Sequence, residues 1–437
     1  MTQPILHSPQ RETLPREELE QLQIERLQST LNRAYRNVAF FRAAFDSHGV
    51  DVEKVHDLGA LRDLPFTTQQ DLQDSYPYDM FAVPLRDILR IHSIPGTGKP
   101  VVVGYTRNDL VHWAECTARL LAAAGITAHD VVQIALDYNI SGGAFGFHQG
   151  AEQIGASVIP SSLSMGVDKQ IVIMRDFKTT ALITTPGCAA NIASGLEEMH
   201  VHPEHLQLRL GLFGGEIWGD HVRHELERRL HVETTDTYGL TEIMGPGVAG
   251  ECHLRCGLHV NEDHFIAEVV HPATLQPVAP GKEGELVITT ITREGFPLIR
   301  FRTGDITSLD ASPCRCGRTF ARMAKVTRRT DDLILFHGTA FFPSQVEQIL
   351  TQAEGASPSY QIILDREDGA DTLEIRVEVS QDIPSLDEAR TLEALRLQLQ
   401  GRVKAALDVE AKVTFVEPRS LRHAAEPGAR VVDKRPE

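Results

Sequence analysis

The sequence predicts an α/β protein: a large N-terminal multi-layer α/β domain with a β subdomain, followed by a small α+β C-terminal domain. Three observations predict this class. Short apolar runs alternate with helical patterns between residues 107 and 230, as in layered α/β folds. Residues 284–307 alternate in polarity like an antiparallel hairpin. The chain has 437 residues, more than one hydrophobic core usually serves.

The N-terminal elements follow from hydrophobic spacing. Apolar residues recur every three or four positions in residues 13–49, which predicts a helix. Residues 107–125 predict a second helix that ends at Gly125. Four apolar runs have the length of strands: 131–136, 156–160, 179–186 and 208–215. Helical patterns occur at 169–177 and 221–230.

The pattern changes at RRTDD, residues 328–332, where a charged turn precedes an apolar strand. Beyond it we expect a helix, a hairpin, a second helix and a last strand, at 341–352, 360–380, 387–407 and 411–418. These elements form a compact module of roughly 105 residues. We therefore divide the chain into domains 1–330 and 331–437.

Composition excludes several classes of protein. The net charge is −17 and no long basic run occurs, so a nucleic-acid partner is disfavoured. No run of 18 apolar residues exists to span a membrane. The N-terminal residues are charged and lack an apolar signal region, which predicts a cytoplasmic protein.

A loop rich in glycine, threonine and lysine lies within HSIPGTGKPVVVGYT, residues 92–106. It is not a Walker A loop, because Pro100 follows Gly98-Lys99 and Ser93 stands where that motif has its first glycine. Backbone N–H groups, a hydroxyl and a lysine can still bind phosphate. The alternative is an ordinary turn before a strand.

Four further stretches carry candidate chemistry: FGGEIWGD (213–220), YGLTEIMGPGVAGEC (238–252), LIRFRTGD (298–305) and RRTDD. Singly, each has a structural reading as a turn, a core ring or a helix cap. In this order, and with GLHVNEDHF (257–265) and TDDLILFHGTAFFPSQVE (330–347), they resemble one family. From about residue 20 to its end, the chain resembles the phenylacetate–coenzyme A ligase branch of the adenylate-forming enzymes.

The resemblance implies a site for ATP and Mg²⁺. Tyr238 would stack on adenine, Asp305 would hold the ribose hydroxyls, and Thr241 with Glu242 would meet the α-phosphate and Mg²⁺. The full nucleotide-binding set is Ser93, Thr97, Gly98, Gly214, Gly215, Glu216, Tyr238, Gly239 and Asp305. The catalytic set is Lys99, Thr241, Glu242 and Arg329. Asp331 and Asp332 match the hinge about which a mobile C-terminal domain rotates.

The implied reaction has two steps. A substrate carboxylate attacks the α-phosphorus of ATP, giving an acyl-adenylate and pyrophosphate, and a thiol such as coenzyme A then takes the acyl group. The acid-binding set is Tyr138, Phe145, Phe147, Met244, Gly245 and Pro246. These residues suit an aryl acid, either phenylacetate-like or a larger bicyclic or tricyclic acid of secondary metabolism, such as a phenazine-type acid of antibiotic biosynthesis. Each of the aromatic rings could instead be a core residue. A homodimer is common in the branch.

Two departures from the family fall on the phosphates. Pro427 stands where the family has the lysine that bridges the substrate carboxylate and the α-phosphate. In the loop, the second serine, first glycine and first threonine of the family are replaced by Ile94, Pro95 and Gly96. Three readings stay open. Adenylation is slow and another cation substitutes, from among Lys434, His423 and Arg430. Or the enzyme only forms thioesters from ready-made adenylates, or it binds nucleotide with little turnover.

The cysteines suggest a metal. Cys252, His259, Cys314 and Cys316 would make a Cys₃His set of the structural zinc type. Cys256 is a rival fourth ligand, and reduced buried thiols without metal are the alternative. Four protein ligands would leave no open position for catalysis.

Overall fold

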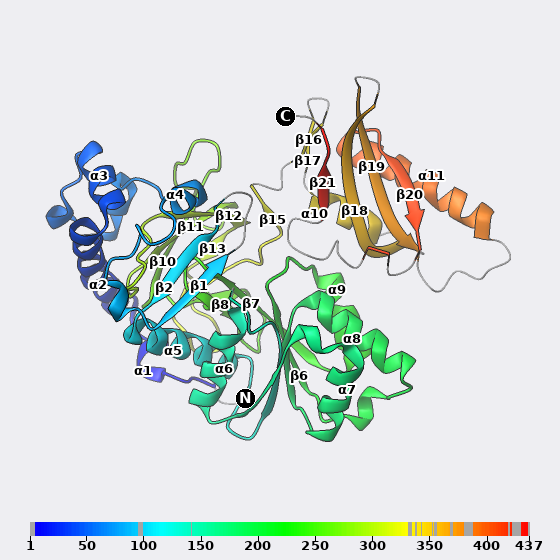
Figure 1. Cartoon of the computed structure of the whole chain (residues 1–437), viewed down its shortest axis with the longest axis horizontal. Coiled ribbons are helices and arrows are strands. Elements are labelled where there is room, and N and C mark those ends of the chain that lie inside the picture. Colours follow the sequence, from blue (N-terminus) through cyan, green and yellow to red (C-terminus); the bar gives the residue numbers. More distant parts are fainter. Residues whose placement is uncertain are drawn as a thin grey trace. The chain divides into compact units, whose positions relative to one another are not determined.

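The computed structural model describes residues 5–94, 99–140, 142–330, 334–336, 339–341, 343–351, 353, 356–367, 370–379, 388–417, 420–421 and 430–435. The chain separates into two compact units, Met1–Val326 and Thr327–Glu437. Figure 1 shows both units, which are described separately below. None of the helices in the described ranges has the length and apolar character needed to cross a membrane.

A nine-stranded sheet organises the first unit, in the order β13-β14-β9-β8-β7-β6-β5-β3-β4. Its strands are β3 (Val131–Ala135), β4 (Ser157–Ser161), β5 (Ala181–Thr184), β6 (Leu210–Gly214), β7 (Glu233–Leu240), β8 (Gly245–Glu251), β9 (Leu258–Val260), β13 (Leu309–Asp310) and β14 (Arg322–Met323). The strands from β4 to β7 pair in parallel, and those from β7 to β13 pair antiparallel. The predicted α/β layering is confirmed.

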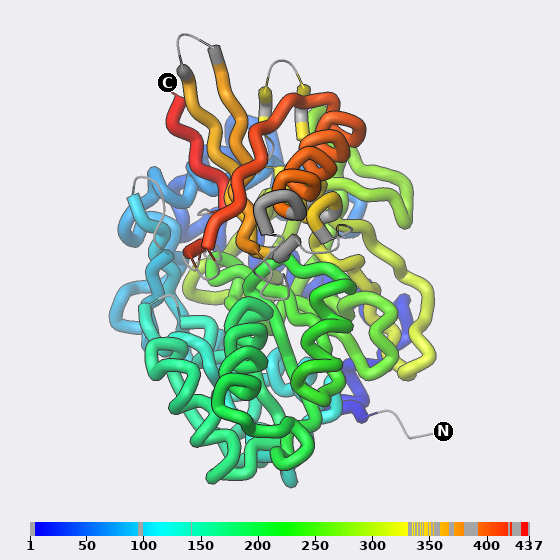
Figure 2. Tube along the Cα trace, turned by 90° about the vertical axis from the view of Figure 1, so that its right-hand side faces the viewer, coloured from blue at the N-terminus to red at the C-terminus, as the bar shows by residue number. Residues whose placement is uncertain are grey.

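Helices cover both faces of this sheet. Those of the first unit are α1 (Pro9–Glu12), α2 (Arg16–Asn37), α3 (Ala39–Ser47), α4 (Gln69–Asp74), α5 (Arg107–Ala123), α6 (Gly143–Ile154), α7 (Val167–Asp176), α8 (Pro186–Glu198) and α9 (Asp220–Leu230). Helices α7, α8 and α9 gather on one side of β6, and α5 and α6 lie on the other (Figure 1). The same group of three green helices stands together in Figure 2.

The predicted helix at 13–49 is two helices, because the backbone of Val38 is extended, with φ −113° and ψ 113°. Val38 is fully buried and its N–H still bonds Ala34 O. The apolar spacing therefore runs on through the break and hides it from the sequence pattern. Helix α6 was not predicted, because three glycines, at 143, 146 and 150, weaken its pattern.

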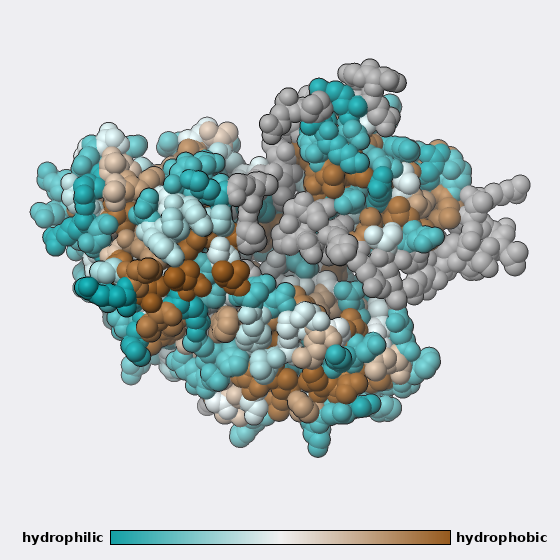
Figure 3. All heavy atoms as spheres, in the orientation of Figure 1, coloured by the Kyte–Doolittle hydropathy of each residue, from teal (hydrophilic) through white to brown (hydrophobic). Residues whose placement is uncertain are grey.

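Two smaller sheets complete the first unit. Strands β10 (Phe265–Val270), β11 (Gly284–Thr290) and β12 (Phe301–Thr307) pair antiparallel, as the alternation at 284–307 predicts. Strands β1 (Arg90–Ile94) and β2 (Val101–Tyr105) form an antiparallel pair. Hydrophobic residues gather on the surface over the region of β1 and β2 in Figure 3. Ile91 on β1 and Leu89 just before it are exposed.

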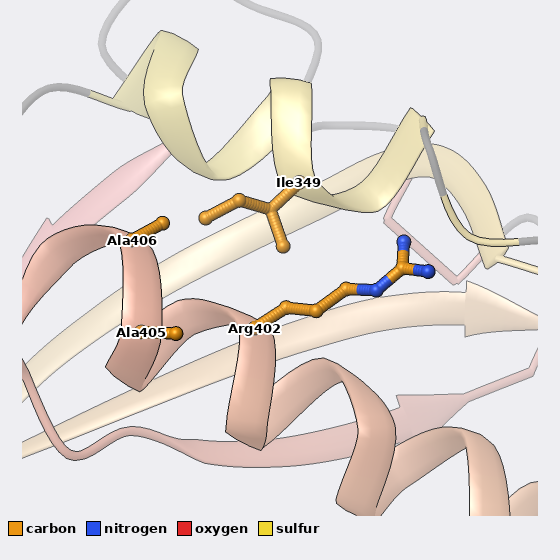
Figure 4. A pocket seen from close by; sticks show the side chains of 4 residues that line it. All are labelled: Ile349, Arg402, Ala405 and Ala406. Atoms are coloured by element: carbon orange, nitrogen blue, oxygen red, sulfur yellow. The ribbon is translucent and has the colours of Figure 1, made fainter.

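The second unit is an α+β module. A four-stranded sheet has the order β20-β19-β18-β21. The elements are β15 (Arg328–Arg329), β16 (Ile334–Phe336), β17 (Thr339–Phe341), α10 (Pro343–Thr351), β18 (Ala356–Glu367), β19 (Ala370–Val379), α11 (Glu388–Leu407), β20 (Lys412–Val416) and β21 (Val431–Asp433). A hollow of about 310 Å³ is lined by Ile349, Arg402, Ala405 and Ala406. Figure 4 shows these four side chains on α10 and α11. None of these four belongs to a predicted site.

A buried charge cluster joins α5 to the segment before β10. The Arg119 guanidinium donates from Nη1 to Oδ1 of Asp263 at 2.7 Å and from Nη2 to Oδ2 at 3.1 Å. Both side chains are buried. His264 is also buried, and its Nδ1 lies 2.9 Å from the hydroxyl of Thr292. Burial lowers the pKa of His264 from 6.5 to about 3.

We expect the His264 imidazole to make the fold sensitive to acid. Its folded pKa lies below its unfolded value, so the unfolded chain binds more protons between pH 6.5 and about 3. The free energy of unfolding should therefore fall as the pH is lowered through this window, by at most about 1.4 kcal/mol per pH unit. The measurement is the thermal unfolding midpoint between pH 7.5 and 5.0 for the wild type and His264→Asn. The variant should depend less steeply on pH, whereas the control His202→Asn, at an exposed histidine, should follow the wild type. Equal slopes for wild type and His264→Asn would contradict this assignment.

Candidate active site

Two predicted nucleotide-binding residues, Tyr238 on strand β7 and Asp305, are in contact. The Tyr238 hydroxyl donates to Oδ2 of Asp305, on β12, at 2.6 Å. Tyr238 is half-buried and Asp305 is buried. The two are 67 residues apart in sequence, and they present an aromatic ring beside a carboxylate. Such a pair can face a purine with the ring and a ribose diol with the acid.

The turn between β7 and β8 carries Thr241 and Glu242. Glu242 is 9% exposed, and its Oε1 accepts a hydrogen bond from Nε2 of Gln69 at 3.1 Å. Gly239, just before this turn, lies at a register shift between β7 and β8. A side chain there would meet Gly245 O at 1.9 Å, so only glycine fits.

Two buried side chains hold the turn in place. The Tyr105 hydroxyl donates to Met244 O at 3.1 Å. The Arg293 guanidinium donates to Ile243 O at 3.1 Å and lies over the Tyr105 ring, 4.2 Å from its centroid. Burial raises the pKa of Tyr105, so the phenol remains a donor at neutral pH. These contacts fix the backbone on either side of Glu242.

Gly214 is the last residue of strand β6, and Gly215 follows it. Gly214 pairs with Thr237, and a side chain at Gly214 would meet the Thr237 hydroxyl at 2.4 Å. Gly215 has φ +80°, which favours glycine. The next residue, Glu216, accepts from the N–H of Gly187 in α8 at 3.0 Å. The three predicted residues thus form an exposed to half-buried edge beside β7.

The structure describes only some residues of the predicted phosphate loop and neither of the two predicted hinge residues. Ser93 is half-buried on β1 and its N–H donates to Ile140 O at 3.0 Å, while Lys99 is exposed. Arg329 is half-buried on β15 of the second unit. The predictions at Thr97, Gly98, Asp331, Asp332 and Pro427 lie outside the described residues.

The predicted acid-binding residues fall into two groups. Tyr138 and Phe145 are half-buried and make an edge-on ring contact, with centroids 5.3 Å apart. Burial raises the pKa of Tyr138. Phe147 and Met244 are instead buried in hydrophobic core clusters. Gly245 and Pro246 begin β8.

Trp113 ties the start of β8 to helix α5. Its Nε1 donates to Pro246 O at 2.6 Å. Gly245 has φ +98°, and a side chain there would meet the Trp113 ring at 2.6 Å. His92 also belongs to this neighbourhood, since its ring centroid lies 5.9 Å from that of Trp113.

The four predicted metal ligands come together. Cys252, His259, Cys314 and Cys316 are buried, and their ligand atoms all lie within 4.8 Å of one another. His259 Nε2 is 3.4 Å from Cys316 Sγ, and its Nδ1 faces Phe320 O at 3.4 Å. Hydrogen bonds from Cys252 and His259 lower the pKa of the Cys316 thiol. Cys256 is exposed and stands outside the group.

Sequence reasoning missed the residues that support the turn: Gln69, Tyr105, Arg293 and Trp113. A polar or aromatic side chain at a strand end or helix start is too common to stand out. Only the three-dimensional pairing distinguishes Gln69, which contacts Glu242 across 173 positions of sequence.

Comparisons with known proteins identify the family of this chain. Residues 97–292 match the AMP-binding enzyme family, and residues 338–435 match the AMP-binding enzyme C-terminal domain. The phenylacetate-coenzyme A ligase of Thermus thermophilus is 40% identical over 427 residues, which cover 95% of this chain and 96% of that protein.

Two solved structures of a 2-hydroxyisobutyryl-CoA ligase also match, each covering 98% of this chain and 92% of theirs. The one in the postadenylation state, with R3-HIB-AMP, has 27% identity and a TM-score of 0.88. The one in the thioesterification state, with 2-HIB-AMP and CoA, has 28% identity and a TM-score of 0.72. The chain therefore belongs to the phenylacetate–coenzyme A ligase branch of the AMP-binding, adenylate-forming enzymes, and is an acid–thiol ligase.

Proposed function

We propose that this ligase activates an aryl carboxylic acid with ATP and passes the acyl group to coenzyme A. In the first step the acid's carboxylate oxygen bonds to the α-phosphorus and pyrophosphate leaves. In the second step the thiol sulfur bonds to the acyl carbon, AMP leaves and the thiol proton is released. ATP and coenzyme A fit the family to which the chain belongs. The choice of an aryl acid rests on the predicted residues Tyr138 and Phe145.

One observation carries the proposal. The Tyr238 hydroxyl donates a hydrogen bond to the Asp305 carboxylate at 2.6 Å, and Tyr238 lies on the strand that leads into the Thr241–Glu242 turn. An adenosine with its base on the face of the ring and its ribose hydroxyls on the carboxylate would direct its phosphates toward that turn. Mg²⁺ bound there would supply neutralisation of the phosphate charge. The protein's own contribution is to hold Glu242 and the reacting oxygens in position.

The test is pyrophosphate release by the purified protein with Mg·ATP across a panel of aryl carboxylic acids, without thiol. Release that depends on one acid supports the adenylation step and identifies the acid class. Coenzyme A added afterwards should convert the adenylate to thioester and AMP. Absence of release with every acid, together with measurable ATP binding, would contradict the proposal.

A second candidate is a thioester-forming enzyme that starts from a supplied adenylate. The observation that favours it is Pro427 in place of the adenylation lysine, since loss of an oriented cation is expected to slow adenylation about a hundredfold or more. Such an enzyme would form acyl-CoA from preformed acyl-adenylate but release no pyrophosphate from ATP. A nucleotide-binding protein without turnover would do neither.

We also propose that the cysteine and histidine group holds a structural zinc ion. The donors fit, because three thiols and one imidazole nitrogen within 4.8 Å match a closed Cys₃His site. His259 would bind through Nε2, with its Nδ1–H directed to Phe320 O. Four protein ligands leave no open position, so the ion would link the segment after β8 to the segment after β13 without a catalytic role.

Replacing Cys316 with serine is expected to remove the zinc and lower the stability of the first unit. Structural zinc binding contributes folding free energy, so its loss should lower the thermal unfolding midpoint clearly. The measurement is zinc content by elemental analysis together with the unfolding midpoint. Cys256→Ser is the matched control, because that exposed cysteine lies outside the group and should change neither value. Wild-type protein that contains no zinc after expression in zinc-supplemented medium would contradict the proposal.

A further inference from the structure

The most informative contact outside the predicted site residues is made by an exposed glutamine. Gln69 is the first residue of α4, and its side-chain amide donates to Oε1 of Glu242 at 3.1 Å. Glu242 is 9% exposed. A contact between an exposed side chain and a nearly buried carboxylate places Gln69 at the solvent edge of the β7–β8 turn.

The backbone before α4 is firmly anchored. The N–H of Thr67 donates to Arg300 O at 3.1 Å, and Arg302 N–H donates to Thr67 O at 2.9 Å. The Thr67 hydroxyl donates to Ile299 O at 2.7 Å. The residues at 300 and 302 flank the start of β12, the strand that carries Asp305. The backbone two residues before Gln69 therefore pairs with the strand that carries the predicted ribose ligand.

The start of α4 is fixed as well. Thr68 and Asp71 form a capping box, in which Thr68 N–H donates to Oδ2 of Asp71 at 2.8 Å and Asp71 N–H donates to the Thr68 hydroxyl at 3.3 Å. This box sets the direction in which Gln69 leaves the helix. The amide therefore reaches Glu242 from a backbone that is held on both sides.

We propose that Gln69 is a positioning residue, which orients the Glu242 carboxylate for the adenylation step. The proposal rests on the function proposed above. An amide is neutral, so it can fix Oε1 by a hydrogen bond without cancelling the carboxylate charge that a cation requires. An ammonium or guanidinium at the same place would neutralise that charge. Because this hydrogen bond holds Oε1, the carboxylate does not rotate freely, and the direction of Oε2 is fixed as well.

The test compares two adjacent glutamines of α4. Gln69→Ala removes the donor, and Gln69→Glu places a like charge against Glu242 without changing the size of the side chain. Gln70→Ala and Gln70→Glu are the matched controls, because Gln70 is exposed and donates to Asp74 at 3.0 Å. For each variant we would measure kcat and KM(ATP) for acid-dependent pyrophosphate release, thioester formation from supplied adenylate, and the unfolding midpoint.

We expect Gln69→Ala to lower kcat about tenfold and Gln69→Glu about a hundredfold, because a displaced catalytic group loses rate steeply. The rate from supplied adenylate should stay within about twofold of the wild type, KM(ATP) should rise by no more than about fivefold, and the unfolding midpoint should not change. The Gln70 variants should match the wild type throughout. Equal kcat values for the Gln69 and Gln70 variants would overturn the proposal, and so would a fall in unfolding midpoint that accounts for the loss.

Nucleotide binding separates this inference from the proposed function. If the wild type releases no pyrophosphate with any acid, the proposed adenylation fails, but the Gln69 contact can still be tested. The readout is then the ratio of ATP affinities with and without Mg²⁺, measured by calorimetry. Gln69→Ala should reduce that ratio about fivefold if the amide orients Glu242 toward the cation. A ratio equal to that of Gln70→Ala would overturn the positioning role.

Discussion

Replacing Glu242 with glutamine is expected to lower the rate of acid-dependent pyrophosphate release by about two to three orders of magnitude. The substitution keeps the shape of the side chain, and the new amide oxygen can still accept from Gln69 Nε2, which now bonds Oε1 at 3.1 Å. It removes the negative charge that would meet Mg²⁺ and the phosphates at this turn in the proposed reaction. The measurement is kcat for pyrophosphate release with saturating Mg·ATP, relative to the wild type.

The matched control for this substitution is Glu197→Gln on α8. Its carboxylate is largely exposed and pairs with Arg229 at 2.9 Å, so its rate should equal that of the wild type. A Glu242→Gln enzyme that retains a third or more of the wild-type rate would show that the carboxylate has no role in the chemical step. A lower unfolding midpoint in Glu242→Gln alone would assign the effect to folding.

Replacing Asp263 with alanine is expected to destabilise the first unit by about 3–5 kcal/mol. The substitution removes the buried, doubly hydrogen-bonded partner of the Arg119 guanidinium, which then keeps the half-buried Glu115 carboxylate. The Arg119 side chain is 2% exposed and the Asp263 side chain 1%, and they meet through two hydrogen bonds. The measurement is the free energy of unfolding from chemical denaturation at pH 7.5. Failure of the variant to yield folded protein is the extreme form of the same result.

A second variant keeps this prediction testable if the alanine protein does not fold. Arg119→Met combined with Asp263→Leu removes both charges and restores apolar volume, and buried pairs replaced in this way often keep their stability. The double variant should be more stable than Asp263→Ala. If Asp263→Ala loses less than about 1 kcal/mol, the buried pair is not important to the fold.

Some strands and the metal-ligand group could be predicted from the sequence alone. The apolar runs at 131–136, 179–186 and 208–215 coincide with β3, β5 and β6 because a buried parallel strand needs apolar residues on both faces. The Cys₃His group was predictable because its residue types are rare and chemically specific. The roles of Tyr238, Asp305 and Glu242 came from motif resemblance and stay predictions, although the first two lie in contact.

Three structural features could not be predicted from the sequence, each for a physical reason. The break at Val38 leaves the helical spacing of apolar residues intact on both sides. The Gln69–Glu242 contact depends on how a loop before α4 pairs with β12, which no local pattern encodes. The burial of Phe147 and Met244, in contrast to the half-buried Tyr138 and Phe145, depends on which face of α6 and of the turn meets the core.

The support beneath the β7–β8 turn has a consequence for changing which acid the enzyme accepts. Tyr105, Arg293 and Trp113 each hydrogen-bond the turn backbone or the start of β8, and Trp113 leaves no room for a side chain at Gly245. A mutant library directed at this turn would therefore collect mainly misfolded proteins. A library at Tyr138 and Phe145, whose half-buried rings contact each other, would change the shape of the proposed acid site without replacing Tyr105, Arg293 or Trp113.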